Sequence, residues 1–239
     1  MKFRTPQWHD EVPSTNTTLA DWLREGRDVP DGFVLAARSQ TAGRGRYERR
    51  WQAQPGRNLT FSVHLRGETP QMRLLSLPIA AALGVAEYLE ALGLVAQTKW
   101  PNDVLVGGRK ICGILAEQST GVVLGVGLNV NMDLADAAAI DRPATSLQIE
   151  TGETRETDAV LVALLLHLEA WIGVWENGGF ASLREAWEAR CVNMGQYVEI
   201  GEGADRRTGI VLGFGEAGQL LLREDDGVRA EVWVGDVGP

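Results

Sequence analysis

The spacing of apolar residues changes at Met194, and this change sets the domain organisation that we expect. Before Met194, apolar residues recur at helical spacing in two long stretches, around 74–93 and 158–176, among runs typical of strands. After Met194 no helical period remains, and four short β-type runs alternate with glycine-containing turns. We therefore predict an α+β domain over residues 1–193, with a mixed β-sheet and flanking helices, followed by a small β-barrel over 194–239.

Caps and periodicity predict the elements of the first domain. Ser14 is a good N-cap for a short helix that stops at Gly26. "FVLAAR" (33–38) reads as a buried strand, and "LTFSVHL" (59–65) alternates apolar residues as a half-buried strand does. Pro78 lies in the first turns of the first long helix. The remaining expected elements are a short helix at about 180–189 and strands around Lys99, in "KICGILAE" and in "GVVLGVGLNV".

Charge, cysteine content and hydropathy disfavour several classes of protein. The formal net charge is −9, whereas nucleic-acid-binding proteins need a broad basic face. Cys112 and Cys191 form no disulfide framework and fit a reducing compartment. The N-terminus has no signal-peptide core, and charged residues or histidine interrupt the most apolar stretches. We expect a cytoplasmic protein that binds neither DNA nor a membrane.

The loop "QTAGRGRYERRW" (40–51) concentrates positive charge in an acidic chain. An arginine run is most often a solvated loop, but this one directly follows an apolar strand, so its base is fixed to the core. Glycines that alternate with arginines let the backbone approach a ligand while guanidinium groups surround it. This favours a small polyanion such as a nucleoside triphosphate. Because close arginines repel one another, we expect the loop to be mobile when empty and ordered when occupied.

A second run, "KWPNDVLVGGRKICGILAE" (99–117), reads as three strands joined by a Pro-Asn-Asp turn and a Gly-Gly turn. Taken alone, Lys110 is an edge-strand lysine, Asn102 and Asp103 are turn formers, and Trp100 is a core residue. The later "GVGLN" (125–129) contains only a lone G-x-G, which is weak evidence for a nucleotide fingerprint.

Taken together and in order, these segments resemble the successive motifs of biotin protein ligases. The matching segments are "STN" (14–16), "QTAGRGRYERRW", "KWPNDVLV" with "KICGILAE", and "GVGLN". The resemblance implies a class II synthetase-like catalytic domain with a small C-terminal SH3-like β-barrel. Because "STN" begins at residue 14, it points to the monofunctional type without an N-terminal DNA-binding domain.

The resemblance also implies the reaction. Biotin and ATP, with Mg²⁺, form biotinyl-5′-AMP, and a lysine of a biotin carboxyl carrier protein of acetyl-CoA carboxylase or a related carboxylase then takes the biotin. Two anions must meet in the first step, so cationic groups are needed to stabilise the developing charge. By matching position, the catalytic residues are Lys110, Arg46 and Asp103. Asp103 is the candidate base for the incoming lysine.

The same matching predicts the binding residues. The biotin-binding set is Ser14, Thr15, Asn16, Gln40, Gly43, Arg44, Gly45, Arg46, Lys110 and Gly113. The ATP-binding set is Arg46, Arg49, Trp51, Asn102, Asp103, Lys110 and Asn129. The resemblance implies that Arg46 and Arg49 hold phosphates, that Trp51 and Asn129 contact adenine, and that Asn102 and Asp103 lie near the nucleotide. Lys110 is expected to contact both the biotin carboxylate and the phosphate. No caged metal ion is expected, because the three histidines have no ligand spacing.

One residue departs from the family pattern. Many members have glycine where this chain has Glu48, beside the predicted phosphate-binding Arg49. We expect Glu48→Gly to change ATP binding and leave biotin binding alone.

Three other functions compete with the ligase interpretation. Lipoate ligases and octanoyltransferases have related folds, but neither the R-R-x-x-G-G-G pattern nor a catalytic cysteine motif occurs, and Cys112 and Cys191 read as core residues. A non-catalytic biotin-binding module would not need Lys110 and Arg46 together.

A homodimer is possible, and the sequence does not decide it.

Overall fold

The computed structural model describes residues 2–47, 49–67, 69–201 and 206–238. Its larger part is a seven-stranded mixed sheet of order β1-β2-β3-β7-β6-β5-β4, in which only β1 and β2 run parallel. The strands are β1 (Gln7–Val12), β2 (Val34–Gln40), β3 (Leu59–Leu65), β4 (Ala96–Lys99), β5 (Asp103–Val106), β6 (Arg109–Ser119) and β7 (Gly121–Leu128).

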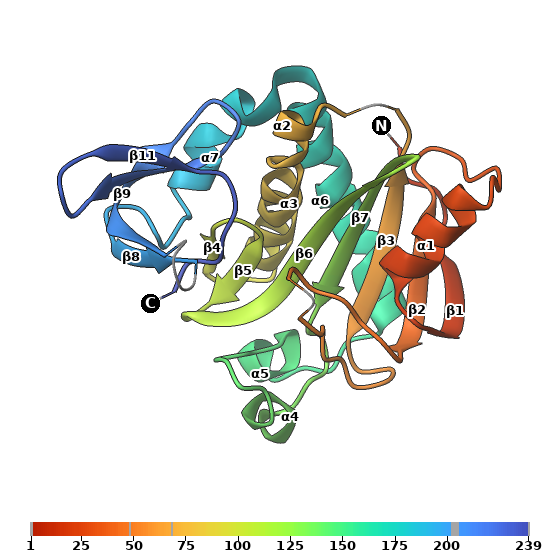
Figure 1. Ribbon diagram of the computed structural model, residues 1–239. Coiled ribbons are helices and arrows are strands. Elements are labelled where there is room, and N and C mark those ends of the chain that lie inside the picture. Colours follow the sequence, from red (N-terminus) through yellow and green to blue (C-terminus); the bar gives the residue numbers. More distant parts are fainter. Residues whose placement is uncertain (1, 48, 68, 202–205, 239) are drawn as a thin grey trace.

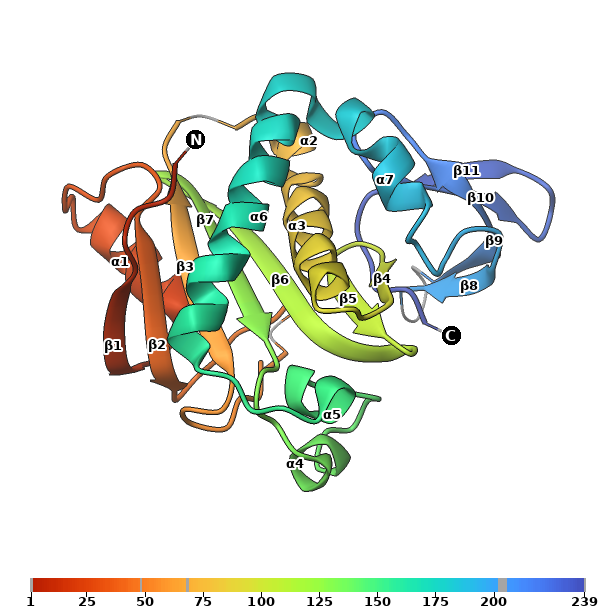
Figure 2. The same ribbon diagram turned by 180° about the vertical axis from the view of Figure 1, so that it is seen from behind.

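Two long helices cover one face of this sheet and α1 covers part of the other (Figures 1 and 2). The helices are α1 (Thr15–Arg24), α2 (Gln71–Leu74), α3 (Leu77–Ala91), α4 (Leu134–Ala138), α5 (Leu147–Thr151), α6 (Thr157–Gly178) and α7 (Arg184–Glu188), with a 3-10 turn η1 (Gly179–Ser182). A Cβ at Gly84 of α3 would lie 3.1 Å from the Leu168 Cα of α6, so this glycine lets the two helices pack closely.

The predicted start and stop of α1 and the predicted place of Pro78 are confirmed. The Ser14 side chain accepts from Thr17 N, and Gly26 has a φ of 74° just after α1 ends. Pro78 lies in the first turn of α3, where its missing N–H costs no helical hydrogen bond.

Two stretches that include these core helices, Met72–Ala91 and Thr157–Ser182, are long and apolar enough to cross a membrane by length and composition alone. Core helices pass the same test, and here both helices pack in one apolar core with the sheet. They are therefore weak evidence for a membrane, and the absence of a membrane partner stays a prediction.

The C-terminal part is a four-stranded antiparallel sheet of order β11-β10-β9-β8, consistent with an SH3-like domain. Its strands are β8 (Tyr197–Ile200), β9 (Arg207–Phe214), β10 (Leu220–Glu224) and β11 (Arg229–Val232). Trp100 joins the two parts, because its buried indole N–H donates to Gly218 O at 3.0 Å. The expected β-runs after Met194 are confirmed, while the domain boundary itself stays a prediction.

Two local expectations are wrong. β3 is buried along its whole length, not on one face, because α1 covers the side that carries Ser62 and the long helices cover the other. The helix expected at about 180–189 is divided between η1 and α7. The edge strand β1 gave no recognised signal, since only Val12 of its six residues is buried.

Candidate active site

The predicted site residues line one cavity of about 560 Å³ on the face of the sheet that carries α1. Its walls are the start of α1, the arginine loop, β6, β7, the segment 140–144 and residues 236–237 from the C-terminal part. The predicted residues that line it are Ser14, Thr15, Asn16, Gln40, Arg44, Gly45, Arg46, Arg49, Trp51, Asn102, Asp103, Lys110, Gly113 and Asn129. Gly43 is the predicted residue that does not line this cavity; with Gln40 and Trp51 it lines a neighbouring cavity of about 370 Å³ under the same loop.

A row of glycines forms the floor of the cavity. Gly113 of β6 lies opposite Gly127 of β7 in the sheet register. A Cβ at Gly127 would lie 2.4 Å from the Trp51 ring, and one at Gly125 would lie 2.2 Å from Asn16 Oδ1. The G-x-G of "GVGLN" therefore makes room for two side chains above the sheet and is not a phosphate-binding turn.

The first turn of α1 forms one polar corner of the cavity. Thr15 N donates to Gln40 Oε1 at 2.7 Å, which ties the helix start to the end of β2. Asn16 Oδ1 accepts from the buried Ser62 Oγ at 2.6 Å, and the same hydroxyl lies 2.8 Å from Thr15 Oγ1. The corner offers both donors and acceptors, as a cyclic urea requires. Ser62 is a contributor that the sequence reading missed.

A bulge brings Lys110 onto the cavity face of β6. The β5–β6 register shifts between Val104 and Leu105, so that Lys110 and Gly113 lie on the same side despite their odd spacing. Lys110 is fixed at both backbone groups, since its N donates to Pro143 O and its O accepts from Thr145 N, each at 2.9 Å. Its Nζ lies 2.6 Å from Asp103 Oδ1 in an ion pair.

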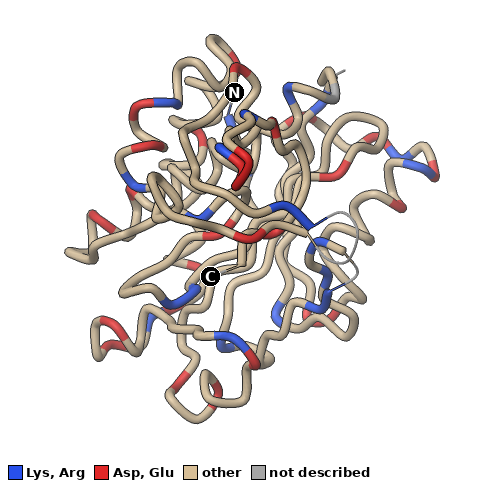
Figure 3. The backbone as a smooth tube through the Cα atoms, turned by 60° about the vertical axis from the view of Figure 1, so that its left-hand side comes forward, with Lys and Arg blue, Asp and Glu red and all other residues tan. Residues whose placement is uncertain are grey.

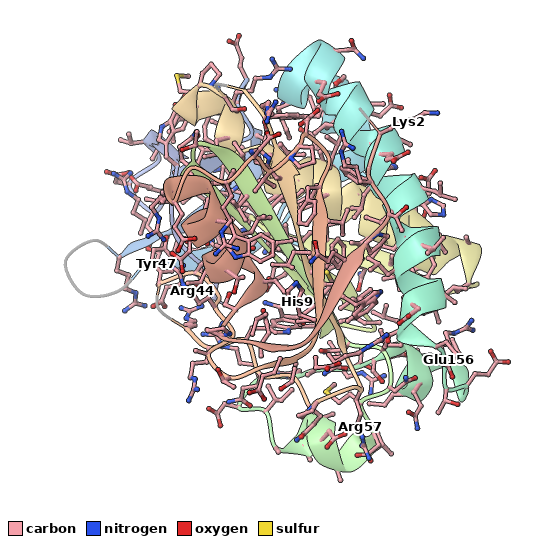
Figure 4. All side chains as sticks on the ribbon, turned by 90° about the vertical axis from the view of Figure 1, so that its right-hand side faces the viewer. Lys2, His9, Arg44, Tyr47, Arg57 and Glu156 are labelled. Atoms are coloured by element: carbon pink, nitrogen blue, oxygen red, sulfur yellow. The ribbon has the colours of Figure 1, made fainter. Side chains whose placement is uncertain are left out.

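The arginine loop is a small hairpin over the cavity, on the opposite side of the molecule from α6 (Figure 4). Arg44 and Arg50 form an antiparallel bridge, Gly45 N donates to Arg49 O at 2.7 Å, and Trp51 N donates to Gly43 O at 3.0 Å. A Cβ at Gly43 would lie 2.5 Å from Trp51 O, which explains the glycine at the hairpin base. Glu48 lies outside the described residues.

All four arginines of the hairpin have acceptors. Arg44 pairs with Glu117, Arg46 and Arg49 both pair with Asp236, and Arg50 donates to Thr41 O. The expected mobility rested on repulsion between unpaired guanidinium groups, and these partners reduce that repulsion. Ordering of the loop by a ligand stays a prediction.

Basic side chains outnumber acidic ones around the cavity. Seven basic residues line it, including Lys99 and Arg142, against the three acids Asp103, Asp141 and Asp236. Burial lowers the pKa of the Lys99 ammonium, and neighbouring Asp103 opposes this change. Over the whole chain, basic and acidic positions are interspersed (Figure 3), so the positive character is local to this site.

Besides Ser62, four contributors could not be predicted from the sequence, for different reasons. Lys99 and Glu117 lie inside the segment 99–117, but nothing in their immediate sequence predicts a role for them. Arg142 and Asp236 lie in the 140–144 loop and at the C-terminus, and only the tertiary fold brings them to the cavity.

Three buried polar atoms at the cavity have no hydrogen-bond partner among the described residues: Trp51 Nε1, Asn129 Oδ1 and Asp103 Oδ1. Asp103 Oδ1 has the Lys110 ammonium beside it in an ion pair, so Trp51 Nε1 and Asn129 Oδ1 are the two without a partner of any kind in the described part of the chain. Asn129 is otherwise fixed, because its Nδ2 donates to Thr145 O at 2.9 Å. Buried donors and acceptors in native proteins are almost always paired, so an unpaired donor and acceptor in one cavity indicate a ligand with both functions.

Asn102 has a structural role in the turn after β4. Its Nδ2 donates to Ile114 O at 2.6 Å, and Ile114 N donates back to Asn102 O at 3.1 Å. The side chain lines the cavity while holding β6 in place.

The cysteines take no part in the site. Both are buried, and burial raises the pKa of both thiols, that of Cys191 to about 11. Within the described part of the chain, no three His, Cys, Asp or Glu side chains are grouped to hold a metal ion.

Comparisons with known proteins agree with one another. Residues 8–133 match the biotin/lipoate A/B protein ligase family. The chain is 35% identical to the biotin–[acetyl-CoA-carboxylase] ligase of Paracoccus denitrificans, over 92% of this chain and 98% of the relative. It is 37% identical to the Mycobacterium tuberculosis protein of the same name, over 95% of this chain and 87% of the relative.

Longer relatives and solved structures match as well. The bifunctional ligase/repressor BirA of Bacillus subtilis is 31% identical over 93% of this chain and 70% of the relative. The biotin protein ligase of Aquifex aeolicus, solved in complex with biotin and ATP, superposes with a TM-score of 0.85 at 31% identity, covering 99% of this chain and 98% of that one.

Proposed function

The chain belongs to the biotin/lipoate A/B protein ligase family, and from this premise we propose that it is a biotin protein ligase. It activates biotin with ATP to biotinyl-5′-AMP and transfers the biotin to a lysine of a biotin carboxyl carrier protein. The acceptor is that of acetyl-CoA carboxylase or a related carboxylase.

The observation that carries this proposal is the position of Lys110 between two chemically different ends of one cavity. One end is the α1 corner with paired donors and acceptors, which suits the ureido ring of biotin. The other end holds Arg46, Arg49 and Lys99, which suit phosphates. An ammonium between them can contact both the carboxylate and the α-phosphate that must meet.

The first half-reaction places two anions in contact, and preorganised cations offset their repulsion. The two backbone hydrogen bonds of Lys110 hold its strand before substrate arrives, so little reorganisation is needed. As the carboxylate oxygen bonds to the α-phosphorus, the bond to pyrophosphate breaks, and Arg46 and Arg49 are suited to stabilise the charge on the departing group.

Adenine fits the unpaired pair of polar atoms described above. Its exocyclic amine can donate to Asn129 Oδ1, and a ring nitrogen can accept from Trp51 Nε1. Satisfying both buried atoms favours adenine over a base with the opposite pattern.

In the second half-reaction, the amine of the carrier lysine attacks the acyl carbon and AMP leaves. The amine must first lose a proton, because its ordinary pKa of about 10.4 keeps it charged at neutral pH. We assign Asp103 as the base that accepts this proton, because its carboxylate lies in the cavity beside Lys110.

The finer parts of the proposal rest on the chemistry of the substrates. Mg²⁺ would arrive with ATP and be held mainly by its phosphates, and the acids that line the cavity, Asp103, Asp141 and Asp236, are the side chains that could hold it. We further propose that the protein works in the cytoplasm without binding DNA or a membrane, as its acidic charge and interrupted apolar stretches favour, and that it can form a homodimer.

Biotin-dependent ATP–pyrophosphate exchange tests the proposal. The wild-type protein should exchange with biotin and not with lipoate or octanoate, and Lys110→Ala should lose at least about 100-fold of the rate. Exchange with lipoate or octanoate would reassign the substrate. Folded protein that binds biotin but exchanges with no acid would make it a non-catalytic module.

A further inference from the structure

Glu117 connects two parts of the cavity that the proposed chemistry uses together. It ends the segment "KICGILAE", and the reaction described above gives it no role. Strand residues two apart share a face, so Glu117 lies on the same face of β6 as Leu115 and Gly113, toward α1. Its side chain is 27% exposed.

One oxygen of Glu117 orients the polar corner. Asn16 Nδ2 donates to Glu117 Oε2 at 2.8 Å, while Asn16 Oδ1 accepts from Ser62 Oγ at 2.6 Å. The amide therefore has an acceptor on one side and a hydroxyl donor on the other. Without the carboxylate, the amide nitrogen keeps only a longer contact of 3.3 Å to Leu115 O.

The same carboxylate anchors the arginine hairpin. Arg44 Nη2 lies 3.0 Å from Glu117 Oε1, and Nη1 lies 3.4 Å from Oε2. Arg44 also lies at the start of the hairpin, where its backbone forms the bridge to Arg50. The ion pair is therefore a side-chain link between the hairpin base and β6, at the point where the hairpin starts over the cavity.

We propose that Glu117 is a positioning residue that couples the biotin-binding corner to closure of the arginine hairpin. The inference rests on the proposed function. The Glu117 carboxylate contacts both Asn16 and Arg44. When one of these two residues is in place, its contact fixes the orientation of the carboxylate for the other. A ligand that orders Asn16 then favours the closed hairpin, and a closed hairpin favours the ligand.

A plain surface ion pair is the competing explanation, because Arg44 is half-exposed and such pairs contribute little. A plain pair would affect neither biotin binding nor hairpin closure. The pair of Arg27 with Glu25 has both side chains more than half exposed and lies away from the cavity residues. It supplies the matched control, Glu25→Gln.

Trypsin reports hairpin closure directly, because it cleaves after arginine and the hairpin contains four. The test compares wild type, Glu117→Gln, Glu117→Ala and Glu25→Gln, with and without biotin, by mass spectrometry of the first cleavage products. Glu117→Gln keeps the shape and an acceptor for Asn16 but loses the charge that holds Arg44. The melting temperature of each variant checks that it is folded.

In Glu117→Gln we expect hairpin cleavage without biotin to be about three- to tenfold faster and the biotin Kd to rise by a similar factor. The KM for biotin should rise, while kcat at saturating biotin stays within about twofold, because Glu117 contacts no reacting atom. Glu117→Ala should weaken biotin binding by about thirtyfold or more, because it also leaves the Asn16 amide without its main acceptor. In a double-mutant cycle, Glu117→Gln should have a smaller effect on biotin binding in an Arg44→Gln background than in the wild type, because the pair is already broken there.

Unchanged cleavage and unchanged biotin affinity in Glu117→Gln would overturn the proposal, and so would equal effects in Glu25→Gln. If wild-type protein bound no biotin, the ligase assignment would fail and the coupling with it. The cleavage rates without biotin would still decide whether Glu117 anchors the hairpin. Should Glu117→Ala fail to fold, Glu117→Gln still gives the decision.

Discussion

Asp236 Oδ1 lies 3.0 Å from Arg46 Nη1, so a carboxylate close to the C-terminus neutralises a guanidinium of the cavity nearly two hundred positions earlier in the chain. Arg49 contacts the other oxygen of the same carboxylate. Both arginines are the residues that we assign to the phosphates of ATP. An incoming nucleotide must therefore replace Asp236 at these two side chains.

Asp236→Asn should lower the KM for ATP by about three- to tenfold, because a neutral amide competes less well than a carboxylate for two guanidinium groups. Exchange assays at saturating biotin measure the change, and the biotin KM should stay constant. Asp226→Asn, which removes an exposed acid from the turn before β11, is the control. A raised KM for ATP would mean that Asp236 holds the arginines in place for the nucleotide.

Asp103→Asn separates the two half-reactions. We expect transfer from preformed biotinyl-5′-AMP to a carrier domain to slow by about 100-fold, because a general base contributes about that factor or more. Exchange should fall less than about tenfold, since Lys110 remains. Asp141→Asn changes another cavity acid and controls for charge. Equal losses in both assays would assign Asp103 to the support of Lys110 instead.

Local signals predicted many of the residues that line the cavity, because these residues lie in short continuous segments. Ser14 caps α1 as expected, and Lys110 is the second residue of β6, just after the Gly-Gly turn. The side of the sheet on which Lys110 lies was not predictable, because the bulge in the β5–β6 pairing reverses the simple alternation of strand residues.

Features that depend on distant contacts were out of reach of the sequence. β3 looked half-buried because its polar residues, Thr60 and Ser62, alternate with apolar ones, yet α1 buries them as well. β1 looked like no strand, because an edge strand needs few buried side chains. The contact of Asp236 with the arginine hairpin depends on how the two sheets pack, so no pattern among neighbouring residues in the sequence predicts it.

Gly127→Ala should disable the site without unfolding the protein. The added methyl carbon would meet the Trp51 ring at 2.4 Å and force the indole off the cavity floor, while the backbone of Gly127 is ordinary strand. We expect biotin and ATP affinities to fall by about tenfold or more, at a stability cost of about 1–3 kcal/mol. Calorimetric titration and thermal melts measure the two effects.

The control for this change is Gly173→Ala on α6, where an added Cβ meets nothing within 4 Å. Alanine in a helix interior should raise stability by up to about 1 kcal/mol and leave binding unchanged. If Gly127→Ala bound biotin and ATP as tightly as the wild type, ligand binding would not depend on the observed position of the Trp51 ring.

Cys112 and Cys191 should resist thiol reagents in the native protein. Burial raises the pKa of Cys191 to about 11 and that of Cys112 further, so almost no thiolate exists at pH 8 and the sulfur atoms are covered. Titration with a chromogenic disulfide at pH 8 should count close to zero thiols in native protein and two in denaturant. A fast-reacting native thiol would contradict the assignment of both cysteines to the core.

Asp158 should make stability depend on acid pH. Hydrogen bonding to Arg38, whose Nη2 lies 2.9 Å from Asp158 Oδ2, holds the pKa of this carboxyl below its usual value. A lowered folded-state pKa adds stability that is fully present above the ordinary pKa of about 3.9 and is lost as pH falls through the folded value. Because both side chains are more than a third exposed, Asp158→Asn should cost only about 0.5 kcal/mol of the free energy of unfolding at pH 7.

Chemical denaturation from pH 7 down to pH 3 should show the gap in free energy of unfolding between wild type and Asp158→Asn closing. Glu216→Gln, which changes an exposed acid in a turn, should show no such gap. A gap that stays constant down to the lowest pH at which both proteins fold would mean that packing of Arg38 on the Trp8 ring, 3.8 Å from its centroid, and not the charge of Asp158, stabilises this contact.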